Sequence, residues 1–279
     1  MPPPAKNLDE LARSLLTKGP TRTLAAAGRR IRLQLGGHWI ADTTLAVFVW
    51  EHPYYPFYYI PKSAFASGTL STQQQQSANA SSSQGYKLAT LGAGGKSTDR
   101  VIVFDDNATQ EGKEGPSPLA GLVRVEFGAV DAWFEEDARI DIHPRDPYKR
   151  VDVVYSSRPV RVLVNGHVVA NAPGGSFHLW ETGLPTRYYL PAAAVDARYL
   201  RDSHTVTGCP YKGEANYYNI SIPGDEKGGD EKTFKDVVWY YKTPKLECAA
   251  VAGCLCFYNE KVDIELDGKL LEKPKSPFS

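Results

Sequence analysis

The chain repeats itself, and this duplication constrains its fold more than any other feature of the sequence. Residues 158–191 match residues 29–61, with Arg, Gly-His, Trp-Glu and Tyr-Tyr-aliphatic-Pro in the same order. The offset is 129 residues at Gly-His and 130 residues at Trp-Glu. Self-similarity over so long a period indicates two tandem copies of one domain. A chain of 279 residues is long enough for each copy to bury its own core.

Composition and pattern suggest where the domains begin and end. Residues 1–28 are expected to form an N-terminal extension with a helix over 8–17, where leucines recur at helical spacing. The first domain is placed at residues 29–150 and the second at residues 151–279. A Ser/Gln-rich insertion at 67–95 interrupts the first domain with few large apolar side chains, which is typical of a surface loop.

The local patterns predict a mostly β fold with a minor α component. Short runs alternate between apolar and other residues, as in Val160-Arg-Val-Leu-Val164, and the Asn165-Gly166 pair that follows is a strong hairpin signal. Short helices are expected where alanine accumulates, at Ala192–Tyr199. Strands and helices do not alternate as in a βαβ fold. We therefore expect two small, mostly antiparallel β domains in the form of small β-barrels.

Charge and cysteine content narrow the function classes. Lys+Arg and Asp+Glu both number 32, so the chain has no excess positive charge for nucleic acid or an anionic membrane. We see no leader segment and no long apolar run, and expect a cytoplasmic protein. Free thiols are expected at Cys209, Cys248, Cys254 and Cys256. Their spacing contains no Cys-x2-Cys pair, so neither a metal site nor another cofactor is predicted.

Gly92–Thr98 resembles a phosphate-binding loop but is not expected to act as one. The motif requires glycine at position 90, where this chain has threonine, and low-complexity sequence precedes it instead of a strand. We expect no ATP or GTP hydrolysis.

The segment Trp180–Tyr189 concentrates side chains that could form a binding site. It contains Glu181, Arg187 and aromatic rings around a Gly/Pro-shaped bend. Arg187 could hold an anion in a bidentate fork, and Glu181 could move a proton. The alternative is that Glu181 and Arg187 neutralise one another while the rings fill the core. The sequence leaves both open.

A second candidate is Cys209-Pro-Tyr-Lys212-Gly213. Pro210 and Gly213 favour a stiff, sharply turning loop that presents Cys209 and Lys212 together. Lys212 could then lower the pKa of the thiol. The alternative is a buried cysteine under a tight turn, with Lys212 in solvent.

Taken together, these runs resemble the tandem form of the family catalogued as domain of unknown function 427. The resemblance extends from residue 29 to residue 268 and implies a β-tent-like domain, similar to folds that hold zinc with Cys-x2-Cys pairs. Those pairs are missing here, so metal is not carried over. The family has also been labelled nucleotidyltransferase-like, but Gly174-Gly175-Ser176 lacks the following carboxylate pair that would hold magnesium, and we do not adopt the label. The matching runs are Ala132–Glu136, His143–Tyr148, Glu181–Pro191, Cys209–Gly213 and Cys256–Asp263.

The sequence supports two functions. The first is a cytosolic, cofactor-independent enzyme, such as a lyase, cyclase or hydrolase, that acts on a small organic metabolite. Glu181 would be its acid/base and Arg187 its clamp, with Cys209 and Lys212 as the polarising or nucleophilic pair. The second is a noncatalytic module that binds a small molecule or a peptide, and a homodimer fits either. The aromatic residues expected at the site are Trp133, Trp180, Tyr188, Tyr189, Tyr211, Tyr218 and Trp239.

Overall fold

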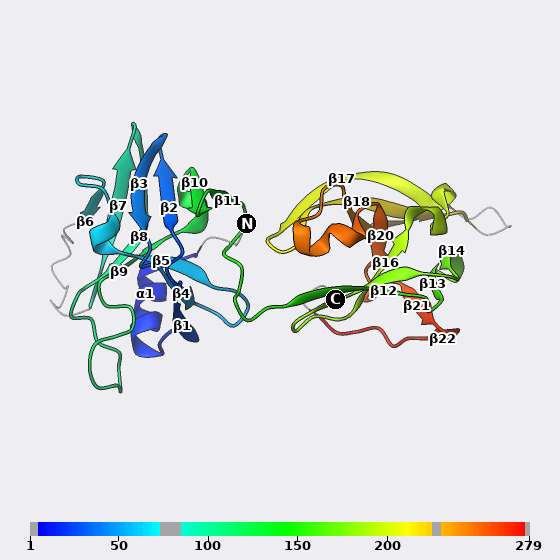
Figure 1. The fold of residues 1–279 in the computed structure, drawn as a ribbon, viewed down its shortest axis with the longest axis horizontal. Helices are drawn as coiled ribbons and strands as arrows, with labels where there is room; N and C mark the ends of the chain where they lie inside the picture. The colour runs from blue at the N-terminus through cyan, green and yellow to red at the C-terminus, as the bar shows by residue number, and fades with distance from the viewer. Residues whose placement is uncertain (1–4, 73–84, 225–229, 277–279) are drawn as a thin grey trace. The chain divides into compact units, whose positions relative to one another are not determined.

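The computed structural model describes residues 5–72, 85–224 and 230–276, which form two units that divide between Asp146 and Pro147 (Figure 1). Both units are mostly β-structure, as expected from the alternating patterns. Each contains one large and one small antiparallel sheet, and the order of the strands is the same in both. The duplication in sequence is therefore a duplication in structure.

The first unit joins a seven-stranded sheet, ordered β1-β4-β5-β9-β8-β7-β6, to a four-stranded sheet, ordered β11-β10-β2-β3. Its strands are β1 (Arg22–Ala25), β2 (Ile31–Leu35), β3 (His38–Thr43), β4 (Val47–Trp50), β5 (Phe57–Pro61), β6 (Leu70–Thr72), β7 (Tyr86–Ala93), β8 (Lys96–Phe104), β9 (Leu122–Val125), β10 (Ala132–Glu135) and β11 (Ala138–Ile140). Its helices are α1 (Leu8–Thr17), η1 (Lys62–Ala64) and η2 (Phe127–Ala129).

The second unit repeats this plan with a seven-stranded sheet, β12-β15-β16-β20-β19-β18-β17, and a four-stranded sheet, β14-β13-β21-β22. Its strands are β12 (Val151–Ser156), β13 (Val160–Val164), β14 (His167–Ala172), β15 (Ser176–Glu181), β16 (Arg187–Pro191), β17 (Leu200–Cys209), β18 (Gly213–Ile222), β19 (Lys232–Tyr241), β20 (Cys254–Phe257), β21 (Asp263–Leu266) and β22 (Lys269–Leu270). Its 3-10 helices are η3 (Ala192–Ala194), η4 (Ala197–Tyr199) and η5 (Leu246–Val251).

Each large sheet is buried on two faces, which we call inner and outer. The inner face packs against the small sheet, and the outer face is covered by α1 in the first unit and by η5 in the second. Because side chains alternate along a strand, neighbours point to opposite faces. Tyr58 and Tyr188 therefore belong to inner clusters, whereas Tyr59 and Tyr189 belong to outer ones. This double burial explains why β5 and β16 read as nearly continuous apolar runs.

Helix α1 confirms the helix expected over residues 8–17. The Asn7 side chain caps its first turn by accepting hydrogen bonds from the backbone N–H groups of Asp9 and Glu10, at 3.0 and 3.2 Å. Its apolar stripe, which includes Ala12 and Leu15, is buried against the outer face of the first large sheet.

The hairpin predicted at Asn165-Gly166 is confirmed. Asn165 and Gly166 have φ values of 51° and 81° and turn β13 into β14, as a two-residue turn with positive φ should. Gly94 and Gly95, within the segment that resembles a phosphate-binding loop, likewise have positive φ and join β7 directly to β8. The expectation that no strand precedes this segment is therefore wrong. That segment is a β-hairpin, with no helix N-terminus to receive a phosphate.

The expected form of the sheets and the expected domain limits need correction. In the part of the chain that the structure describes, the two edge strands of each large sheet, β1 and β6 or β12 and β17, do not pair with each other, so the sheets are open and the small-barrel form is wrong. Residues 22–25 also lie inside the first unit, since β1 pairs with β4. The insertion expected at 67–95 is shorter than that, because β6 and β7 lie within these bounds and Leu91 of β7 is buried in the core. Residues 73–84, at its centre, lie outside the described residues.

Candidate active site

Glu181 and Arg187 lie at the two ends of the connection between β15 and β16. Gly183 has a φ of 79°, and the backbone N–H of Leu184 donates to the Glu181 carbonyl at 2.9 Å, so the connection turns tightly. Although close in sequence, the two charged side chains do not neutralise one another. Glu181 pairs with Lys212, and Arg187 pairs with Glu260.

Lys212 is positioned by the turn between β17 and β18. Cys209 ends β17 and pairs with Gly213, the first residue of β18. Gly213 has a φ of 106°, and a Cβ there would lie 3.2 Å from the Thr243 carbonyl oxygen, so this turn requires glycine. The Lys212 carbonyl also accepts the backbone N–H of Lys245 at 3.0 Å, which ties the turn to the segment leading into η5.

The Lys212 ammonium donates a hydrogen bond to the Glu181 carboxylate, and both side chains are buried, at 12% and 6% exposure. Burial lowers the pKa of Lys212, but the neighbouring Cys209 thiol and the Glu181 carboxylate raise it, and the net direction is upward. Lys212 therefore carries its proton at neutral pH. The expectation of a solvated lysine at this turn does not match the structure.

Three of the four cysteines are buried in the second unit, and Cys209 is half-buried. Burial raises the pKa of the Cys248 thiol to about 11, although the nearby Lys212 charge acts in the opposite direction. Burial also raises the pKa values of Cys254 and Cys256. These three thiols stay protonated at neutral pH, which leaves Cys209 as the most accessible sulfur beside Lys212.

Arg187 forms a separate, fully buried charge cluster. Its guanidinium donates to both Glu260 carboxylate oxygens at 2.7 Å and to the Asn259 side chain at 2.6 Å. It also packs over the rings of Trp239 and Tyr258, at 5.5 and 5.8 Å from their centroids. Arg187 is thus held in place by a bidentate carboxylate of its own unit.

The aromatic residues expected around one site divide between the two faces. Tyr189 and Trp239 share the outer cluster with Cys248 and Cys256, and the Trp239 indole donates to the Tyr189 hydroxyl at 3.0 Å. Tyr188 is on the inner face, where Tyr218 also packs. Tyr211 is buried in the Lys212 turn, and Trp180 is exposed. Trp133 belongs to the core of the first unit, where it stacks on Phe127.

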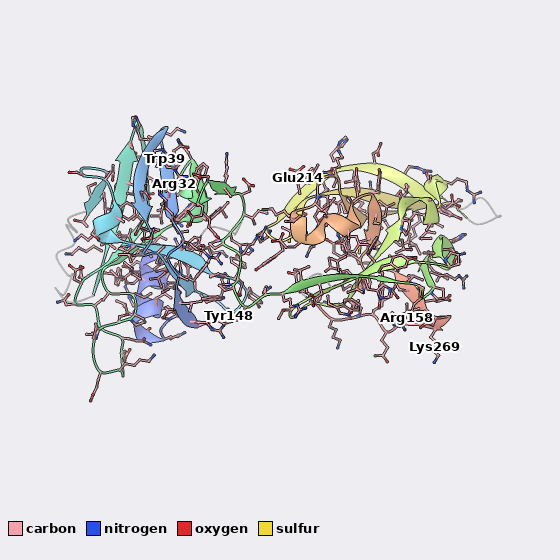
Figure 2. All side chains as sticks on the ribbon, viewed as in Figure 1. Arg32, Trp39, Tyr148, Arg158, Glu214 and Lys269 are labelled. Atoms are coloured by element: carbon pink, nitrogen blue, oxygen red, sulfur yellow. The ribbon has the colours of Figure 1, made fainter. Side chains whose placement is uncertain are left out.

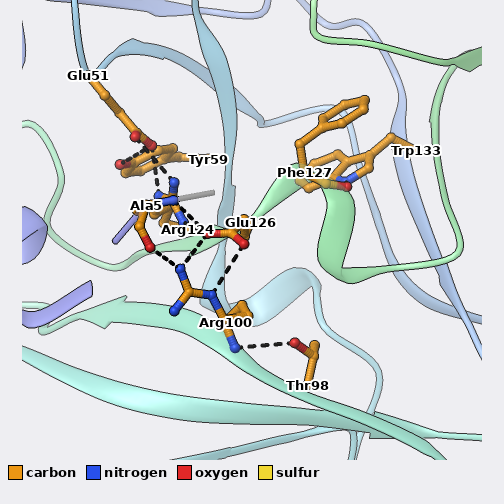
Figure 3. Close-up of polar contacts among 9 residues, drawn as sticks. All are labelled: Ala5, Glu51, Tyr59, Thr98, Arg100, Arg124, Glu126, Phe127 and Trp133. Carbon is orange, nitrogen blue, oxygen red and sulfur yellow. Dashed lines mark hydrogen bonds and ion pairs between the residues drawn. The ribbon is translucent and has the colours of Figure 1, made fainter. Parts of the chain in front are cut away.

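The first unit has a buried ion pair at the equivalent carboxylate (Figure 3). Glu51 accepts two hydrogen bonds from Arg124, at 2.8 and 3.2 Å, and a third from the Tyr59 hydroxyl at 3.2 Å. Arg124 is paired with Tyr59 across β5 and β9, the register position that Cys256 holds beside Tyr189 in the second unit. The buried carboxylate is therefore paired with an arginine on a central strand in the first unit and with a lysine on a turn in the second.

The first unit has no lysine equivalent to Lys212, because its corresponding strands are joined by a different segment. The strands that flank the Lys212 turn, β17 and β18, correspond to β6 and β7 of the first unit. Residues 73–85 join those two strands, and all of them belong to the Ser/Gln-rich insertion. The insertion therefore stands where the second unit carries Cys-Pro-Tyr-Lys.

Sequence reasoning missed Glu260, Asn259 and Cys248 as partners of the candidate residues. Asn259 and Glu260 lie in the run Cys256–Asp263 that carries the family resemblance, so a signal was present, but nothing local linked them to Arg187. No group of three or more His, Cys, Asp or Glu side chains is placed to hold a metal ion within residues 5–72, 85–224 and 230–276.

Comparisons with known proteins identify the repeated unit. No helix in the described part of the chain is long and apolar enough to cross a membrane. None of the curated proteins compared with this chain matches it. A family model described as domain of unknown function (DUF427) matches residues 23–136 and again residues 152–268, one match in each structural unit. The chain therefore belongs to the DUF427 family and carries two tandem copies of its domain.

Proposed function

We propose that the second unit is the catalytic part of a cofactor-independent enzyme that acts on a small organic molecule with a carbonyl or anionic group. The observation that carries the proposal is the buried Lys212–Glu181 pair beside the half-buried Cys209. An ion pair costs desolvation energy on burial, so a purely structural pair gains little over apolar packing. A pair of this kind can serve proton transfer.

Comparison with the first unit supports this choice of unit. Its carboxylate, Glu51, is paired with Arg124, and a guanidinium does not release its proton in proteins. Lysine is a compact point charge whose proton can be exchanged, and its partner carboxylate can accept one. The same position in the fold therefore holds a fixed charge in one copy and a transferable proton in the other.

The proposed roles follow from this chemistry. The Lys212 ammonium donates a hydrogen bond to a substrate oxygen and transfers its proton to that oxygen as negative charge develops there. When the substrate oxygen replaces Glu181 as the hydrogen-bond acceptor of Lys212, the Glu181 carboxylate takes up a proton from the substrate or from water. Cys209 lies at the exposed end of this arrangement as a nucleophile or polar contact. Arg187, held by Glu260, keeps β16 and Trp239 in position.

A substitution that copies the first unit tests the proposal. Wild type, E181Q, K212M and K212R are incubated with a mixture of small keto acids, hydroxy acids and aldehydes, and consumption is followed by mass spectrometry. Turnover should be lost in E181Q and K212M. K212R should keep the ion pair and the melting temperature, yet lose at least about a hundredfold in rate, the lower range for one acid–base group. Unchanged turnover in K212R and E181Q contradicts the assignment.

The alternative proposal is a noncatalytic binding module for a small molecule or peptide. Its supporting observation is that Lys212 keeps its proton at neutral pH, as a binding cation must. A binder should raise its melting temperature with a compound from the same mixture without consuming it, and K212R should bind as well as wild type. For either function we propose a cytoplasmic location, since all four cysteines are free thiols.

A further inference from the structure

The inner face of the second unit contains a polar cluster away from Lys212 and Glu181. Ser176 and His178 lie two residues apart on β15, so both point to the same side of the sheet. They are almost fully buried, at 1% and 3% exposure. Tyr188 is the cross-strand partner of His178 on β16, and the two rings meet edge to face with centroids 4.9 Å apart.

Two buried polar atoms in this cluster have no hydrogen-bond partner. They are the Ser176 hydroxyl oxygen and the His178 Nε2. Buried polar groups in native proteins are almost always satisfied, because leaving one unpaired forfeits its hydration without replacement. Two such groups on one side of one strand indicate that something other than the protein's own side chains completes them.

The first unit shows that the fold does not require polar residues here. At the offset of 130 residues, Ser176 and His178 correspond to Ala46 and Phe48, which are buried in the hydrophobic core of the first unit. Phe48 packs on Tyr58 with centroids 4.6 Å apart, as His178 packs on Tyr188. The same position in the second copy has become polar at both residues while its burial has been kept.

The two units also differ at the position that faces the hydroxyl group of the inner tyrosine, Tyr58 or Tyr188. In the first unit the Tyr58 hydroxyl donates to the Glu135 carboxylate at 2.8 Å. Glu135 is paired with Ile31, and the matching position beside Val160 in the second unit is Leu266. The register position of the carboxylate that accepts the Tyr58 hydrogen bond is therefore occupied by an apolar side chain in the second unit.

The charge around the cluster favours an anion. Burial lowers the pKa of His178, the Arg158 charge lowers it further, and Asp267 opposes them with a smaller effect. Arg158 is at the surface of the second unit and pairs with Asp267 at 2.6 Å (Figure 2). At the imidazole, the positive charge of Arg158 thus outweighs the negative charge of Asp267.

We propose that Ser176, His178, Tyr188 and Arg158, which we call the polar corner, bind a small oxyanion, the carboxylate or phosphate group of a ligand of the second unit. The Ser176 and Tyr188 hydroxyls and the His178 Nε2–H group donate hydrogen bonds to its oxygens, and Arg158 supplies the charge. This site is independent of the proposed reaction, because β15 directs Glu181 to the outer face and His178 to the inner one.

The test uses the full chain and two probes, sodium acetate and sodium phosphate, at constant ionic strength set with chloride. The ring resonances of His178 are assigned by their loss in H178F and followed by NMR during each titration. We expect a saturable shift with at least one probe. A response to acetate alone identifies a carboxylate site, and a response to phosphate alone identifies a phosphate site.

Matched variants separate binding from a general salt effect. R158Q retains His178 and changes an exposed residue, so the fold should persist, and we expect the midpoint of the titration to rise at least about tenfold, the loss for one charged hydrogen bond. S176A restores the residue of the first unit and should also weaken binding. K212R should leave the shift unchanged. The proposal is overturned if neither probe shifts the His178 resonances, or if R158Q and S176A both bind like wild type.

Discussion

Glu51 and Glu181 show how one residue keeps its place while its partner changes. Glu181 is the last residue of β15, and Glu51 directly follows the equivalent strand β4. Both point to the outer face of their large sheet. Arg124 reaches Glu51 from β9, a central strand that is separated from β4 by β5, whereas Lys212 reaches Glu181 from a turn 31 residues away. A charge delivered by a turn can be repositioned by a small backbone change, which a charge on a central strand cannot.

The Cys248 thiol should make the free energy of unfolding decrease at alkaline pH. Its pKa is raised to about 11 in the folded protein, and an unfolded thiol titrates near 8.5. The unfolded chain thus loses its proton first, so this contribution is complete below about pH 8.5 and is lost as the pH rises to about 11. We expect C248A to lessen the alkaline loss in unfolding free energy by about 2–3 kcal/mol.

Urea unfolding of wild type and C248A at pH 7, 8, 9, 10 and 11 measures this difference. The two profiles should run parallel up to about pH 8 and converge above it. Buried Cys256 also has a raised pKa, so the wild-type protein should lose more stability than Cys248 alone explains. Profiles that stay parallel up to pH 11 would show that Cys248 does not titrate differently in the two states.

At the residue scale, the alternation of side chains along a strand already shows that the candidate aromatic residues cannot all line one site. Trp180 and Glu181 are neighbours on one strand, as are Tyr188 and Tyr189, so each pair must point to opposite faces. The partners of Glu181 and Arg187 were beyond prediction. They depend on which strands become neighbours across 31 and 73 residues, and local patterns do not encode that pairing.

At the scale of the element, the turn between β17 and β18 determines where Lys212 lies. Gly213 combines a φ of 106° with a close approach to the Thr243 carbonyl, so a side chain there is strained in two ways. We expect G213A to destabilise the protein by about 1–3 kcal/mol. Urea unfolding measures the loss.

G253A is the matched control for this substitution. Gly253 also has a positive φ, 72°, but a Cβ there meets nothing within 4 Å. Only the conformational cost of about 1 kcal/mol applies at Gly253. If G213A is no more destabilising than G253A, the contact with Thr243 does not constrain the turn.

Local patterns predicted the elements whose signals are complete within a few residues. The helix over 8–17 has its cap and apolar stripe in one segment, and the Asn165-Gly166 turn needs only two residues with positive φ. The strand β17 was not predicted, because most of its side chains are exposed and polar. Its backbone pairing with β18 holds it in place, and an apolar pattern does not reveal such pairing.

At the scale of the whole molecule, the repeat predicted two structurally similar units but not the open form of their sheets. A barrel and an open pair of sheets have the same alternating strands, and they differ only in whether the edge strands meet. The repeat also makes each unit a control for the other. Positions that differ between buried equivalents, such as Phe48 and His178, are changes that the fold tolerates but does not need.

The two units should fold independently of one another. Each has an inner and an outer hydrophobic cluster composed of its own residues, and no described strand pairing joins one unit to the other. A domain with its own core can fold alone. We therefore expect residues 147–279, expressed separately, to fold cooperatively, with the Lys212–Glu181 pair in place.

Thermal unfolding followed by circular dichroism tests this independence. The isolated second unit should melt in one cooperative transition, and K212M should lower its midpoint by the same amount as in the full chain, because both partners of the ion pair lie within the unit. K212R should restore most of the loss in both contexts. An isolated unit that does not melt cooperatively, or in which K212M has no effect, would show that residues of the first unit are needed to complete the site.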